Sequence, residues 1–67
     1  MAKIILNGKK INITSKTSIY DILKKFKIDN KKVAIEYNGT IVQKLDYKKK
    51  VLKNKDILEV VNFIGGG

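Results

Sequence analysis

The spacing of apolar and polar positions changes along the chain, and each change marks an element. Residues 3–7 and 10–14 alternate apolar and polar side chains, which is the period of a strand with one buried face. Asn7 and Gly8 lie between these runs, and both tolerate the positive φ angles of a tight hairpin turn. The pattern therefore predicts a β-hairpin at the start of the chain.

From residue 18 the period becomes helical. Ser18 is a suitable N-cap, and Asp21, three residues later, imitates a capping box while placing negative charge in the first turn. We expect an amphipathic helix whose apolar stripe covers a sheet. The stripe is spaced i, i+3, i+4 and i+7 and consists of Ile19, Ile22, Leu23 and Phe26.

A second hairpin follows the helix. Residues 33–37 and 40–42 read as strands, and the Asn38-Gly39 step between them is again typical of a tight turn. The segment that follows is irregular and basic. We expect Leu45 and Tyr47 to anchor it to the core.

The last strand, residues 57–64, is the most continuously apolar run, which is typical of a strand between two neighbours. The helix supplies the connection that parallel neighbours require, so we place this strand beside the first one and parallel to it, with a hairpin on either side. The fold class is α+β, a β-grasp with a mixed four- to five-stranded sheet and one helix on one face. Residues 1–64 form the domain, and Gly65, Gly66 and Gly67 form a flexible tail.

One helix covers only one face of the sheet, so the opposite, open face meets water or a partner. We expect Glu59, the only charged residue of the last strand, on the open face, because burying an unpaired charge is costly. Cover of this face by the basic segment 43–51 is the alternative. By the period of two, the inward positions are Ile4, Leu6, Leu58 and Val60. The open face then carries an apolar group suited to docking a partner, formed by Ile5, Val61 and Phe63.

Composition limits the chemistry open to the chain. The 67 residues suit one small domain without Cys or His, which excludes disulfides, thiolate or imidazole metal sites and nucleophile–imidazole pairs. No apolar run is long enough to cross a bilayer and no leader opens the chain. We therefore expect a cytoplasmic protein, monomeric when alone.

The charge balance is strongly basic. All fifteen basic residues are Lys, against six acidic residues, which gives a net charge of +9. Such a charge attracts nucleic acid, but Arg, the residue preferred for bidentate contacts to phosphates and bases, is absent. Abundant Ile and Asn point to an A/T-rich coding sequence, so a solvated basic surface is favoured over nucleic-acid binding.

The three glycines carry the candidate chemistry. They form the thinnest peptide available, and extended they span about 10 Å, which suits entry into a narrow slot. The α-carboxylate of Gly67 is ionised at neutral pH and is a nucleophile toward an activated phosphate. A frayed or linker-like terminus is the alternative.

The opening hairpin, the segment 34–42 (AIEYNGTIV) and the ending 56–67 (DILEVVNFIGGG) together resemble the ThiS family. These are ubiquitin-like sulfur carriers of thiamine biosynthesis. The resemblance spans nearly the whole chain, and the ending is its specific part. Two positions depart from it: Gln43 stands where many members have Pro, and Lys55 where many have Gly.

The resemblance implies a carrier protein that is not itself an enzyme. An adenylating enzyme of the ubiquitin-activating type (ThiF-like) would use ATP and Mg²⁺ to convert the Gly67 carboxylate into an acyl adenylate. A persulfide on a partner would supply sulfur, and the resulting thiocarboxylate would donate it to thiazole synthase (ThiG-like). Gly67 is then the modified residue, Gly65 and Gly66 give slim access to it, and the chain itself binds no cofactor or metal.

Three alternatives stay open. The small subunit of molybdopterin synthase is a sulfur carrier on the same fold, although those chains tend to be longer, with prolines before the tail, and this sequence has no Pro. A small basic RNA-binding β-grasp module would use the lysines of 24–27 and 48–50, and its binding would weaken steeply with salt. A protein-conjugating modifier would join Gly67 to a target lysine.

Overall fold

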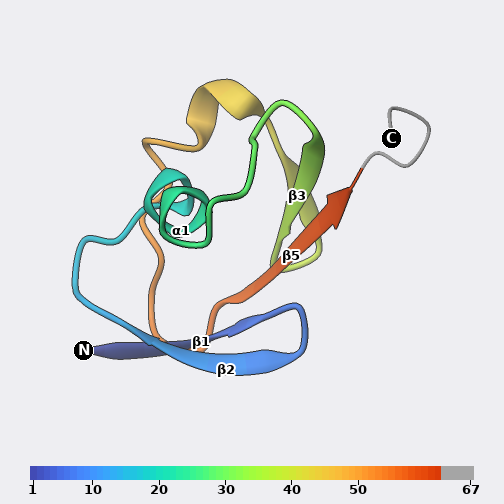
Figure 1. Cartoon of the computed structure of the whole chain (residues 1–67). Helices are drawn as coiled ribbons and strands as arrows, with labels where there is room; N and C mark the ends of the chain where they lie inside the picture. The colour runs from blue at the N-terminus through green and yellow to red at the C-terminus, as the bar shows by residue number, and fades with distance from the viewer. Residues whose placement is uncertain (63–67) are drawn as a thin grey trace.

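The β-strands form a single mixed sheet with the last strand at its centre (Figure 1). The computed structural model describes residues 1–62, and the sheet has five strands in the order β2-β1-β5-β3-β4. The strands are β1 (Ala2–Leu6), β2 (Lys9–Ile13), β3 (Val33–Tyr37), β4 (Thr40–Val42) and β5 (Ile57–Asn62). One α-helix, α1 (Ile19–Lys25), and one short 3₁₀ helix, Lys44–Asp46, complete the order. The β-grasp architecture is confirmed.

Strand β5 pairs with β1 on one side and β3 on the other. The β1 pairing is parallel, with Ile5 opposite Ile57, and the β3 pairing is antiparallel along all of β3. Both hairpins turn at the predicted Asn-Gly steps, where Asn7 and Asn38 have φ angles of 48° and 50°. The central place of the last strand and its parallel partner are therefore as the sequence predicts.

Helix α1 begins as predicted and ends at Lys25, so that Phe26, the last residue of the predicted apolar stripe, lies just beyond it. The Ser18 hydroxyl accepts the Asp21 N–H at 3.1 Å, and the Asp21 carboxylate accepts the Ser18 N–H at 2.9 Å, which completes the capping box. At the other end Lys27 takes φ 57°, and the Ile28 N–H returns to the Leu23 carbonyl at 2.8 Å. This Schellman closure leaves Phe26 at the C-cap, 45% exposed, so its predicted place in the core is wrong.

The core lies between α1 and one face of the sheet. Side chains of α1 meet inward-facing positions of four strands, and the residues involved include Ile19, Ile22, Leu23, Ile4, Ile13, Ile35 and Leu58. Val60 and Leu6 are partly buried against this cluster, as their parity predicts. None of the helices within residues 1–62 has the length and apolar character needed to cross a membrane.

The segment after β4 packs on the helix side of the sheet. Tyr47 is buried, and its carbonyl accepts the Tyr20 N–H at 3.0 Å, while the Lys50 carbonyl accepts the Ile19 N–H at 3.0 Å. Tyr47 is therefore the predicted core anchor. Leu45 is not, because the tight 3₁₀ turn directs it outward and leaves it 87% exposed.

Candidate functional site

The open face of the sheet carries the predicted docking residues that the structure describes. Val61 is 48% exposed and Ile57 is 43% exposed, and both lie on the outward side of β5. Ile5, the neighbour of Ile57 across the β1–β5 ladder, is partly buried. Because the segment after β4 packs against α1, it does not provide the cover considered from the sequence. Phe63 and the three glycines lie outside the described residues.

Two asparagine side chains hold β5 at separate points. The Asn7 Oδ1 accepts the Val60 N–H at 2.7 Å, and its Nδ2 donates to the Val60 carbonyl at 3.4 Å. Asn7 follows directly after β1, so its amide continues the hydrogen bonding of β1 along β5. At the start of β5, the Asn38 Oδ1 accepts the Ile57 N–H at 2.7 Å. The sequence identified these asparagines as turn residues only. Their amide side chains, which both donate and accept hydrogen bonds, are the feature that could have indicated the contacts with β5.

A buried carboxylate fixes the approach to β5. Asp56 is 6% exposed and accepts hydrogen bonds from the Tyr37 hydroxyl at 2.7 Å, the Asn38 Nδ2 at 3.2 Å and the Lys53 N–H at 2.7 Å. Burial raises the pKa of Asp56, but these hydrogen bonds outweigh burial and leave that pKa below its ordinary value. Burial, followed by the Asp56 contact, raises the pKa of Tyr37 to about 12. The network ties the end of β3 to the residue before β5.

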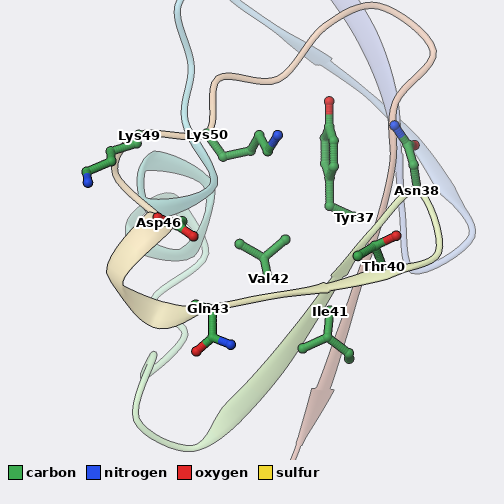
Figure 2. A pocket seen from close by; sticks show the side chains of 9 residues that line it. All are labelled: Tyr37, Asn38, Thr40, Ile41, Val42, Gln43, Asp46, Lys49 and Lys50. Carbon is green, nitrogen blue, oxygen red and sulfur yellow. The ribbon is translucent and has the colours of Figure 1, made fainter.

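An open hollow of about 580 Å³ lies beside the edge strand β4 (Figure 2). In it the Lys50 Nζ lies 4.8 Å from the centre of the Tyr37 ring. Among the described residues that line the hollow, Asp46 is the one carboxylate. The lining consists of Tyr37, Asn38, Thr40, Ile41, Val42, Gln43, Asp46, Lys49 and Lys50. The hollow contains none of the predicted site residues, and within residues 1–62 no group of three or more carboxylates is placed to hold a metal ion.

The two lysine groups considered for nucleic-acid binding meet at one aromatic ring. The Lys24 Nζ lies 5.9 Å and the Lys48 Nζ 4.8 Å from the centre of the Tyr20 ring. Tyr20 belongs to α1, so this basic surface lies on the helix side of the sheet. It is separate from the open face.

Comparisons with known proteins agree on one family. The model of the ThiS family matches residues 4–67. The sulfur carrier protein ThiS of Bacillus subtilis (strain 168) is 38% identical over 63 residues, which is 92% of this chain and 96% of that protein. The thiazole synthase of Paramagnetospirillum magneticum is 37% identical over 65 residues, which is 97% of this chain.

The chain spans only a fifth of that thiazole synthase, 20% of its length. A similar relation holds for the thiazole synthase of Magnetococcus marinus, at 40% identity and 20% of its length. Among solved structures, the crystal structure of the thiamine biosynthesis protein ThiS from Geobacter metallireducens matches with a TM-score of 0.84. It is 24% identical, and the match covers 97% of this chain and 99% of that one. The shared fold is a ubiquitin-like β-grasp.

Proposed function

The chain belongs to the ThiS family, and we propose that it is a sulfur carrier of thiamine biosynthesis that carries sulfur at the carboxylate of Gly67. The observation that carries this proposal is the match to the Bacillus subtilis sulfur carrier, which extends over nearly all of both chains. The family match also runs through Gly67 itself. The names of the thiazole synthase relatives support thiazole synthase as the acceptor.

The proposed reaction begins on a ThiF-like adenylating enzyme, which uses ATP and Mg²⁺. The Gly67 carboxylate attacks the α-phosphorus of ATP, and pyrophosphate leaves, so that an acyl adenylate forms. The terminal sulfur of a partner persulfide then attacks the acyl carbon and displaces AMP. A second thiol cleaves the resulting acyl disulfide, becoming disulfide-bonded to the donor sulfur, and releases the thiocarboxylate.

The described part of the chain supports this role by anchoring the strand that leads toward the glycines. Asn38 and Asn7 hold β5 at Ile57 and Val60, and the buried Asp56 precedes the strand directly. A firmly paired strand limits the positions available to the segment that follows it, which favours productive entry into an enzyme cleft. Gly65 and Gly66 would pass through the narrow part of that cleft because they lack side chains.

Reconstitution with two acceptors tests the proposal and separates the pathways. The chain is converted to its thiocarboxylate and supplied to a ThiG-like thiazole synthase with the other thiazole precursors, and in parallel to the large subunit of molybdopterin synthase. We expect formation of the thiazole product and no molybdopterin. The reverse result would assign the chain to the molybdopterin pathway, and transfer to neither acceptor would contradict both.

A further inference from the structure

The only two glutamates of the chain lie opposite each other on the open face. Glu36 of β3 and Glu59 of β5 are register partners in the antiparallel β3–β5 ladder, so their side chains leave the same face of the sheet. Directly opposed residues have Cβ atoms about 5 Å apart. Like charges in this arrangement destabilise a sheet.

This pairing is unexpected in a chain with fifteen lysines and six acidic residues. Three of the four aspartates stabilise local structure, because the carboxylates of Asp21, Asp29 and Asp56 accept backbone N–H groups. No side-chain hydrogen bond within residues 1–62 uses either glutamate. The described structure therefore gives the pair no stabilising role in the fold.

Exposed apolar side chains surround the two carboxylates. Ile41 of β4 is the register partner of Glu36 and is 59% exposed, and Val61, two residues after Glu59, is 48% exposed. Ile57, two residues before Glu59, is 43% exposed. A partner that covers these apolar side chains also removes water from the glutamates. Desolvated carboxylates are costly unless the partner supplies a positive charge.

We propose that Glu36 and Glu59 together receive one basic side chain, preferably the guanidinium of Arg, from the apolar docking surface of the adenylating enzyme. Arg is preferred because its planar fork donates to two carboxylates with little loss of freedom. Charge complementarity carries this assignment: the face is negative at its centre, while Lys3 on β1 and Lys10 on β2 lie at its flank. The inference rests on the proposed function, because it names the contact through which the carrier is activated.

The position of the pair on β5 fits an enzyme that acts on Gly67. Gly67 is eight residues after Glu59, a reach of about 26 Å when extended. An activating domain can therefore contact the pair while its nucleotide site holds the glycines. The lysines beside the Tyr20 ring lie on the helix side of the sheet. On the open face, the two glutamates are therefore available to bind a cation from the partner.

Adenylation kinetics test the inference. Glu36→Gln and Glu59→Gln each remove one charge while preserving size, and Asp46→Asn makes the same charge change in the 3₁₀ helix, away from the open face. ATP–pyrophosphate exchange is measured with the ThiF-like enzyme as a function of carrier concentration. We expect each glutamate variant to raise KM about tenfold with kcat unchanged, whereas Asp46→Asn keeps both constants.

A measurement without the enzyme accompanies the kinetics. Either glutamate variant relieves the repulsion between opposed carboxylates, so the urea midpoint of unfolding should rise at low salt and the gain should shrink at high salt.

Failure of the unchanged chain to support ATP–pyrophosphate exchange would contradict the proposed function. Normal exchange with unchanged KM in both variants would overturn the present inference alone, as would a KM effect equal to that of Asp46→Asn. If the glutamate variants were impaired only in sulfur transfer to thiazole synthase, the inference would also be overturned, because it names the adenylating enzyme as the partner.

Discussion

The backbone keeps the conformations of Gly and Pro at two positions where other residues stand. Lys55 has φ 74°, in the left-handed region that glycine adopts without strain, and the resemblance to the ThiS family pairs it with Gly. Gln43 has φ −71° and ψ 146°, which a proline ring would permit, and the family often has Pro there. The departures therefore change the energy of these loops more than their shape.

Replacing Lys55 by Gly should stabilise the fold. We expect Lys55→Gly to raise the free energy of unfolding by about 1 kcal/mol, because the strain of a side chain at positive φ is removed. Lys55→Ala is the matched control, since it removes the same charge but keeps the Cβ, and it should give no gain. Urea unfolding measures both, and an equal gain in both variants would attribute the effect to charge instead.

The exposure of two apolar side chains, Phe26 and Leu45, could not be predicted from the sequence. The helical period correctly placed Ile19, Ile22 and Leu23 in the core, but it could not show that the chain would leave the helix at Phe26 through a lysine at positive φ. Leu45 was misplaced for a related reason, because three-residue 3₁₀ turns have no periodicity to read.

At the scale of elements, strand order followed from simple rules. The predicted elements were two Asn-Gly hairpins, one amphipathic helix and one continuous apolar strand. They are consistent with a parallel pair of β1 and β5, and the observed register confirms this pair. The side-chain links between elements were not predictable in this way. The hydrogen bond between Tyr37 and Asp56 joins residues 19 positions apart, and no local pattern reports such a contact.

The Tyr37–Asp56 link should make stability depend on pH at both ends of the scale. The pKa of Asp56 is lowered on folding, so its contribution is present above the ordinary value of about 3.9 and is lost as the pH falls through the lowered folded value. The pKa of Tyr37 is raised to about 12, so its contribution is present below about pH 10 and is lost as the pH rises toward 12.

Tyr37→Phe should lower the free energy of unfolding at neutral pH by about 1 to 2 kcal/mol, because a buried carboxylate loses a donor. The variant should also show a smaller loss of stability between about pH 10 and 12. Tyr20→Phe serves as the control, because the Tyr20 hydroxyl makes none of the side-chain hydrogen bonds found within residues 1–62. Urea unfolding across the pH range measures these effects, and equal behaviour of the two variants would contradict the link.

The asparagine contacts to β5 should be separable by amide hydrogen exchange. Asn7→Gly keeps the positive φ of the turn but removes the acceptor of the Val60 N–H, so the opening free energy at Val60 should fall by about 1 kcal/mol. Asn38→Gly should produce the corresponding change at Ile57. If each variant accelerated exchange at both amides equally, the asparagines would be acting on the whole sheet and not at separate points of β5.

At the scale of the whole molecule, the two faces of the sheet differ in how their charges are arranged. Lysines gather around Tyr20 on the helix side, whereas the centre of the open face carries the opposed glutamates and exposed Val61, with Lys3 and Lys10 at its flank. A net charge of +9 summed over the chain gives no indication of this division. The parity of Glu59 was enough to predict which face of the sheet is open. The pairing of Glu59 with Glu36 could not be predicted, because it depends on the register between two strands that are distant in the chain.

The proposed sulfur-carrier role requires Gly67 to be the residue that receives sulfur. Intact-mass spectrometry tests this after incubation of the chain with ATP, Mg²⁺, a ThiF-like adenylating enzyme and a persulfide donor. A variant with one residue added after Gly67 is the control, because it should fold equally well but remain unmodified. We expect the unchanged chain to gain the mass difference between a sulfur and an oxygen atom, localised to Gly67 by fragmentation. An unchanged mass with the active cognate enzymes, or the same gain in the extended variant, would contradict the proposed sulfur-carrier role.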